Sequence, residues 1–485
     1  MKTVPALLLG WIMLGGPASG PWLQAGDIGQ EVVVRTVQKK EIGLDWLLDR
    51  PALFTTTLEE FEKQYQKGSF AWLDKEKTRA RFNPDRVDLK LRGEESGETI
   101  VSFKGARISG VMISVMNKGD DGYIKEAPFK KAITTASAML KAVAKVAESP
   151  RKKNETISKA DGLVWSTKQA LYMLEYLWVP QEQRDGRIWF PHAEFVRIRI
   201  LPPQILMGSQ QNTVKTNISG PTLAKRVKKE GTRVWLEGIP MVDQGSKGYC
   251  AVASFERVMR YYGSQVDMHD LADLANANAF GTSPSAMKDA VHKMAVRSGL
   301  RTREPIFMEG KDYDSLIKAY NREVKKLKTG EELFDISSVG EMYQEMDPGL
   351  FKTMRTKEAG FTKFSAEVAR SINAGVPVMW ALQLGMFWEE GLEDSYEANR
   401  FKETSGEDPA AADPAQPEPD AELPATRPAR PPASMAGGHM RLIIGYDPKA
   451  RLIVYTDSWG PGHEMKQMSL EEAYTVTMAL FMVEP

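Results

Sequence analysis

The surroundings of Cys250, the only cysteine among the 485 residues, suggest nucleophilic chemistry. Downstream of it, apolar residues recur at the i, i+3, i+4, i+7 spacing of a helix packed on a core, and these are Ala251, Val252, Phe255, Val258, Met259 and Tyr262. The pattern predicts that a helix begins at Cys250. Unpaired N–H groups and the positive end of the dipole at a helix N-terminus stabilise a thiolate, which is the nucleophile. The alternative is that Cys250 is a small buried apolar residue, as most free cysteines are.

Gln244 lies six residues upstream, across the turn "GSKG". A side-chain amide beside the backbone N–H of a nucleophile is the arrangement that an oxyanion hole needs in acyl transfer. The simpler interpretation of Gln244 is a solvated side chain in a loop. Both interpretations stay open from this residue alone.

A candidate base and its orienting partner lie near the C-terminus. The runs "MRLIIGY" and "RLIVYTD" resemble strands, and Asp447-Pro448-Lys449-Ala450 between them is a turn-type tetrapeptide, so a β-hairpin is predicted. A fold-back centred near Pro448 places His439 opposite Asp457, within one residue. Directly paired side chains have Cβ atoms about 4.5 to 5.5 Å apart, which permits an imidazole–carboxylate hydrogen bond. A one-residue slip would send the two side chains to opposite faces.

These motifs together resemble those of papain-like cysteine peptidases. "QGSKGYC" is similar to the family's oxyanion glutamine and nucleophile, and "DSWG" is similar to its closing "NSWG". "CAVASFERVMRYYG" with "MHDLADLA" resembles the bacterial C39-like branch, in which aspartate is the usual third member. The resemblance implies a helix-plus-antiparallel-sheet fold with Cys250 as nucleophile, His439 as base, Asp457 as orienting residue and Gln244 as oxyanion donor. It also implies that Trp459 shields the His–Asp pair.

The sequence departs from the papain pattern in two respects. Lys247-Gly248-Tyr249-Cys250-Ala251 lacks both the first cysteine and the following aromatic residue of the papain signature. Cys250 and His439 are also further apart than the roughly 130 to 150 residues of that signature. A proline-rich insertion at 403–436 explains the excess. It has too few apolar side chains to offset its ordering entropy, so we expect a disordered surface loop.

The function expected from these motifs is that of a thiol hydrolase, most simply a peptidase that works through an acyl-enzyme on Cys250. An amidase or a transglutaminase-type acyl transferase would use the same triad, and a papain-like binding module could keep the fold without turnover. No metal or organic cofactor is implied, because the five histidines are scattered and no glycine-rich nucleotide loop occurs. The expected partner is a peptide or protein substrate. The charge balance of 64 basic against 64 acidic residues gives no argument for nucleic acid.

The first 25 residues have the pattern of a secretory signal peptide. Lys2 precedes an apolar run from Val4 to Leu14, and small residues follow, so cleavage is expected between Ala18 and Ala25. The run is too short to span a bilayer, and no later segment reaches about 18 uninterrupted apolar residues. We therefore expect an exported protein, periplasmic or extracellular, without a membrane span in its mature chain.

The rest of the chain divides into two predicted domains of α+β class. Residues 26–207 alternate strand-like runs with helix-like stretches such as Pro128–Ala147, which indicates an N-terminal α+β domain of unknown role. Its strand-like runs are "EVVVRT", "RVDLKL", "TIVSFKG", "GVMISVMN" and "FVRIRIL". Residues 208–235 are predicted to be a linker, and residues 236–485 to be the papain-like domain.

Overall fold

The fold is described from a computed structural model. The residues that it describes are 39–66, 68–84, 86–121, 124–151, 160–184, 187–189, 191–203, 218, 220–244, 248–264, 268, 271, 284–389, 430–431, 436–460 and 462–485. Residues Lys40–Pro485 form one compact unit. In the described part, no helix is both long and apolar enough to cross a membrane.

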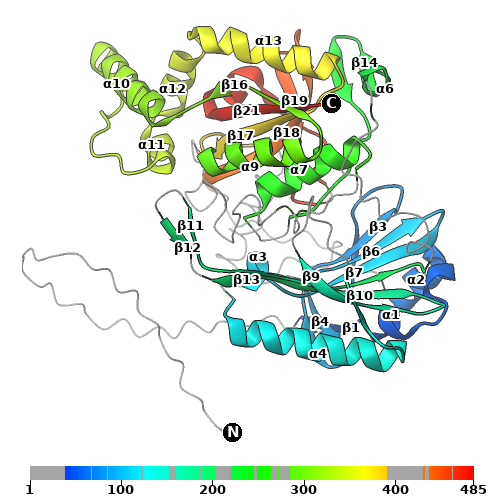
Figure 1. Ribbon diagram of the computed structural model, residues 1–485. Coiled ribbons are helices and arrows are strands. Elements are labelled where there is room, and N and C mark those ends of the chain that lie inside the picture. Colours follow the sequence, from blue (N-terminus) through cyan, green and yellow to red (C-terminus); the bar gives the residue numbers. More distant parts are fainter. Residues whose placement is uncertain are drawn as a thin grey trace, which may run out of the picture. The chain divides into compact units, whose positions relative to one another are not determined.

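An eight-stranded sheet forms the centre of the N-terminal half, in the order β2-β3-β6-β7-β13-β10-β9-β8. Every neighbouring pair in it is antiparallel. Its strands are β2 (Ala71–Trp72), β3 (Arg79–Phe82), β6 (Thr99–Lys104), β7 (Arg107–Asn117), β8 (Ser149–Pro150), β9 (Asp161–Ser166), β10 (Leu171–Val179) and β13 (His192–Leu201). Helix α4 (Glu126–Ala144) lies along one face of this sheet (Figure 1). It packs there because Phe129, Ala136, Leu140 and Ala144 form one buried apolar stripe.

Smaller elements surround this sheet and share its hydrophobic core. A three-stranded sheet has the order β1-β4-β5, and β11 and β12 form a hairpin. The bounds are β1 (Lys40–Gly43), β4 (Val87–Leu91), β5 (Glu94–Ser96), β11 (Glu182–Arg184), β12 (Arg187–Trp189), α1 (Asp45–Asp49), η1 (Leu53–Thr55), α2 (Leu58–Gln64) and α3 (Lys118–Asp121). A capping box between Thr57 and Glu60 starts α2. The core of this half is separate from that of the C-terminal half.

A second sheet, whose strands do not follow the order of the sequence, forms the centre of the C-terminal half. Its order is β14-β15-β18-β17-β21-β16, with β19 paired to β18 and β20. All of its pairs are antiparallel. Its strands are β14 (Val227–Glu230), β15 (Arg233–Leu236), β16 (Arg301–Phe307), β17 (Val378–Leu384), β18 (Gly437–Asp447), β19 (Leu452–Thr456), β20 (Lys466–Ser469) and β21 (Thr477–Glu484).

Helices cover this second sheet on both faces. In Figure 1, α7 and α9 lie on one side of it and α13 on the other. The helices of this half are α6 (Gly220–Ala224), α7 (Cys250–Tyr261), α9 (Pro284–Arg297), α10 (Gly310–Leu327), α11 (Val339–Glu345), α12 (Pro348–Arg355), α13 (Ala359–Asn373) and α15 (Leu470–Val476). Because both faces are covered, strands β17, β18 and β21 are almost continuously buried.

The α+β class is confirmed, and several predicted elements are present. The helix that begins at Cys250 is α7, the helix predicted at 128–147 is α4, and four of the predicted strands are β4, β6, β7 and β13. The linker prediction is wrong over residues 220–235. They form α6, β14 and most of β15, because β15 hydrogen-bonds to β18 and extends the second sheet. The signal peptide, the run "EVVVRT", the first part of the predicted linker and nearly all of the proline-rich insertion lie outside the described residues.

Candidate active site

Cys250 is the first residue of α7 and is only 7% exposed. The helix follows Tyr249, and no side chain caps its N-terminus, so the first backbone N–H groups of α7 have no partner within the helix. A hydrogen-bond and charge interaction with Cys250 contributes to the raised pKa of His439. The predicted nucleophile therefore lies near the predicted base.

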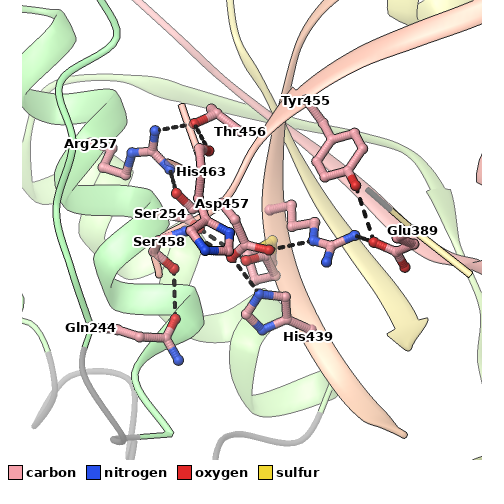
Figure 2. A network of polar contacts seen from close by, with 12 residues as sticks. Gln244, Ser254, Arg257, Glu389, His439, Tyr455, Thr456, Asp457, Ser458 and His463 are labelled. Atoms are coloured by element: carbon pink, nitrogen blue, oxygen red, sulfur yellow. Dashed lines mark hydrogen bonds and ion pairs between the residues drawn. The ribbon is translucent and has the colours of Figure 1, made fainter. Parts of the chain in front are cut away.

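His439 lies on β18, and Asp457 directly follows β19. His439 Nε2 and Asp457 Oδ1 are 2.7 Å apart, and both side chains are buried (Figure 2). Burial by itself lowers the pKa of His439, but the charge and hydrogen bond of Asp457 and the contact with Cys250 outweigh it and raise that pKa to about 9. The imidazole is thus held in its charged form at neutral pH.

The predicted hairpin is present, but its predicted register is wrong by two residues. Leu442 pairs with Thr456, so the position opposite Asp457 is that of Arg441 rather than His439. The pairing at the turn, Asp447 with Leu452, is three residues from the predicted register, and a β-bulge between Ile443 and Gly445 moves the register back by one residue. A slip of two residues keeps the same face of the strand, which is why His439 still reaches Asp457 diagonally.

Arg441 is a functional candidate that sequence reasoning missed. Its Nε donates to Asp457 Oδ2 at 2.6 Å, and its Nη1 contacts Glu389. Tyr455 completes the network by donating its hydroxyl to Glu389 Oε2 at 3.1 Å (Figure 2). Burial raises the pKa of Asp457, but the charges of His439 and Arg441 outweigh it and hold that pKa well below the usual range. One signal was available in the sequence, because residues i and i+2 of a strand share a face and so place Arg441 beside His439.

Trp459 stacks on the triad histidine. Its ring centroid lies 4.8 Å from that of His439 with an interplanar angle of 25°. The guanidinium of Arg441 lies 5.4 Å from the same indole. On another side of Trp459, His463 makes an edge contact at 5.6 Å, and its main-chain oxygen accepts from Asp457 N–H. The indole therefore covers the His439–Asp457 pair, as the family resemblance implied.

Gln244 is buried and fixed by Ser458, the residue after Asp457. Its backbone N–H donates to Ser458 O at 2.8 Å, and Ser458 Oγ donates to Gln244 Oε1 at 2.6 Å. Because the amide oxygen accepts this bond, the NH₂ group lies on the side away from Ser458 (Figure 2). An amide NH₂ group is the kind of donor that an oxyanion hole requires.

Arg257 connects α7 to the end of β19 and to Asp457, which follows it, and no sequence pattern singled out this arginine. From α7, its Nη1 donates to Asp457 O at 2.7 Å, its Nη2 to Thr456 Oγ1 at 2.6 Å and its Nε to Pro240 O at 2.9 Å. Burial lowers the pKa of this guanidinium to about 10, against the opposing charge of Asp457. Its three donors fix the distance between α7 and Asp457.

Among the described residues, no group of three or more His, Cys, Asp or Glu side chains is arranged to hold a metal ion. The site instead combines a thiol, an imidazole that is charged at neutral pH, a carboxylate whose two oxygens both accept hydrogen bonds, and an amide held by Ser458. Such a set can add a thiolate to a carbonyl carbon and stabilise the resulting oxyanion.

Comparison with known proteins agrees with this geometry. Residues 236–478, half of the chain, match the family model described as Peptidase_C39 like family. The match begins in β15 and ends in β21, so it includes all four candidate residues. No curated protein matches the chain.

Proposed function

The chain belongs to the C39-like peptidase family, and from this premise we propose that it is a cysteine peptidase that cleaves peptide bonds through Cys250, His439 and Asp457. The observation that carries the proposal is the buried His439–Asp457 pair at 2.7 Å, whose histidine also interacts with the buried Cys250. A base oriented by a carboxylate and in contact with a nucleophile is the arrangement that activates a thiol for acyl transfer.

In the proposed reaction, the Cys250 thiolate attacks the carbonyl carbon of the scissile peptide bond. The negative charge that develops on the carbonyl oxygen is stabilised by the Gln244 NH₂ group and the Cys250 backbone N–H. The imidazolium of His439 gives its proton to the leaving amine, the C–N bond breaks, and an acyl-enzyme remains on the sulfur. His439 then takes a proton from water, whose oxygen attacks the thioester and releases the acid and the free thiol.

The decisive experiment compares the wild type with Cys250→Ala on a diverse peptide library, with products identified by mass spectrometry. We expect cleavage by the wild type and essentially none by the variant, whose stability should change little because cysteine packs like a small apolar residue. Equal hydrolysis by both proteins would refute the mechanism.

Labelling by an iodoacetamide-type probe near neutral pH separates the proposal from an inactive binding module. An activated thiolate reacts far faster than an inert buried thiol, so rapid and saturable labelling of Cys250 is expected. Rapid labelling without peptide cleavage would indicate an amidase or a transglutaminase-type activity, which amine acceptors and non-peptide amides would then reveal.

We also propose that the protein is exported after removal of a signal peptide, and that its N-terminal half is a separate α+β domain. The first 25 residues support export by their charge and apolar pattern. Mass spectrometry of the mature chain should give an N-terminus that lies between residues 19 and 26. Recovery of the chain with Met1 retained, in the cytoplasmic fraction alone, would contradict export.

A further inference from the structure

A pocket of about 430 Å³ is lined in part by Trp459. The catalytic half contributes Asp243, Trp459 and His463 to its lining. The N-terminal half contributes the end of β3 and the following turn, with Arg81, Asn83 and Arg86. Both halves of the chain thus line one cavity within the compact unit Lys40–Pro485.

The position of this pocket relative to the triad indicates which part of a substrate it receives. Trp459 lines the pocket and stacks on His439 at 4.8 Å, and Asp243 directly precedes Gln244. His439 must protonate the leaving amine, so the leaving part of the substrate departs on the side of this histidine. The pocket is therefore placed for the part of a peptide that follows the scissile bond.

The N-terminal wall of the pocket is attached to the catalytic loops by direct contacts. Arg81 is buried and bonds both Glu98, which directly precedes β6, and Asp243. A second contact involves Tyr249, the residue before Cys250. Its hydroxyl donates to Asn117 Oδ1 at 3.3 Å, and both side chains are buried. The N-terminal half is thus attached to the residues that directly precede Gln244 and Cys250.

The charged groups of the lining differ in whether they are already paired. Arg81 and Asp243 form an ion pair. Burial, together with the charge of Lys466, lowers the pKa of His463, so this imidazole is neutral at pH 7. Arg86, in contrast, is exposed, and its guanidinium has no hydrogen bond or ion pair with any described residue. A guanidinium without a partner at a pocket wall matches a carboxylate, which it can bind through two parallel N–H···O bonds.

We propose that the N-terminal half of the chain forms one wall of the substrate site, and that Arg86 on this wall selects a carboxylate in the leaving part of a peptide substrate. The proposal rests on the peptidase function proposed above. It gives the N-terminal half a role in substrate selection.

The test uses quenched fluorescent peptides that share one sequence before the scissile bond, taken from a cleavage site found in the library. The leaving part carries Asp, Asn or Lys at each of its first three positions. We expect wild-type kcat/KM to be about 1.5- to 5-fold higher for Asp than for Asn, the range of one exposed ion pair, and the preference to fall at high salt. Arg86→Glu should reverse the preference toward Lys.

Two controls distinguish an effect of Arg86 in the pocket from a general effect of surface charge. Arg322→Glu changes another exposed arginine, on α10, and should keep the wild-type preference. A substrate with aminomethylcoumarin as leaving group has no carboxylate and should be hydrolysed equally by the wild type and Arg86→Glu. Cleavage of all peptides without an acidic preference, or the same preference in Arg86→Glu, would overturn the inference and leave the peptidase function intact.

Failure of the peptidase function would be recognised separately, by absence of both peptide cleavage and rapid Cys250 labelling. In that event, singly labelled peptides of one fixed sequence that carry Asp, Asn or Lys at the same position are titrated onto the Cys250→Ala protein by fluorescence anisotropy. Tighter binding of the Asp peptide, lost in Arg86→Glu, would support the carboxylate site without turnover. Equal affinity for the Asp and Asn peptides would refute it.

Discussion

Arg441 and Asp457 form a buried ion pair in which Arg441 Nε donates to Asp457 Oδ2 at 2.6 Å. The other carboxylate oxygen, Oδ1, accepts from His439 Nε2 and from the Ser458 backbone N–H at 2.8 Å. Both oxygens of Asp457 are therefore acceptors in the folded protein. An amide at this position could supply only one acceptor oxygen.

The Asp457→Asn variant should consequently lose most of its activity. If the amide oxygen faces His439 and Ser458, its NH₂ group opposes the donor Arg441 Nε–H, and if the amide is flipped, it opposes Ser458 N–H. We expect kcat/KM to fall about 10²- to 10⁴-fold, since the imidazole also loses the charge that stabilises its protonated form. An unsatisfied buried donor should in addition cost about 1 to 3 kcal/mol of unfolding free energy.

Steady-state kinetics and urea unfolding of this variant check both effects. Asp447→Asn serves as the matched control, because Asp447 is the half-buried last residue of β18, at the turn end of the same hairpin. Wild-type kcat/KM in Asp457→Asn would show that Asp457 is not the orienting residue.

Arg441 should act as a positioning residue, and two variants can separate this role from mere structural support. Arg441→Met leaves Glu389 and Asp457 buried without their cation, which should cost about 3 to 5 kcal/mol of stability. Adding Glu389→Gln removes one of these carboxylates and should restore part of that stability. Loss of a nearby cation should also raise the pKa of His439 and move the alkaline limit of activity upward. Unchanged pH dependence in the folded Arg441→Met variant would mean that Arg441 serves stability alone.

The local elements of the site could be predicted from the sequence because local patterns specify them. The 3.6-residue apolar period after Cys250 fixes the start of α7, and the two apolar runs around Pro448 fix the hairpin. The register was not predictable, since it depends on where the turn falls and on the bulge at Gly445. A Cβ at Gly445 would meet Val234 O at 2.6 Å, so the close approach of β15 is what requires glycine there.

The contacts that complete the site join residues far apart in the chain, and no sequence period encodes them. The contact between Glu389 and Arg441 depends on the pairing of β17 with β18. In the same way, Arg81 reaches Asp243 only through the packing of one half of the chain against the other. Such pairs are set by tertiary structure, so no sequence pattern distinguished Arg81 or Arg257, and for Arg441 the alternation of the strand indicated only its place beside His439.

Replacement of Gln244 should affect catalysis and leave stability nearly unchanged. Gln244→Ala removes the proposed oxyanion donor, and we expect kcat to fall about 10²- to 10³-fold. Ser458→Ala keeps the amide but removes the 2.6 Å hydrogen bond that orients it, so a smaller loss of about 2- to 10-fold is expected. Stopped-flow acylation rates measure the effect directly.

Ser371→Ala is the control for the serine variant, because Ser371 is a buried serine of α13 that donates to Val376 O at 3.0 Å. It should lose similar stability and keep full activity. If Gln244→Ala acylates as fast as the wild type, another group must stabilise the oxyanion.

The pH dependence of activity should reveal the raised pKa of His439. Because Asp457 and Cys250 raise this pKa from 6.5 to about 9, the protonated imidazole that pairs with the thiolate should persist to alkaline pH. A folded-state pKa above the unfolded value contributes stability that is fully present below about pH 6.5 and is lost as the pH rises through about 9. We therefore expect the alkaline limb of kcat/KM to have its midpoint near pH 9, and thermal stability to decline over the same interval.

The Asp457→Asn variant tests whether the carboxylate charge raises the pKa of His439. In Asp457→Asn, the residual activity should show an alkaline midpoint at lower pH, because the anion that favours imidazolium is absent. His292→Gln provides the matched control, since His292 is an exposed histidine of α9 bonded to Thr302, and it should leave the midpoint unchanged. An alkaline midpoint that stays in place in Asp457→Asn would assign the limb to a group other than His439. A wild-type midpoint near pH 6.5, the ordinary value for histidine, would show that the ion pair with Asp457 does not form in the working enzyme.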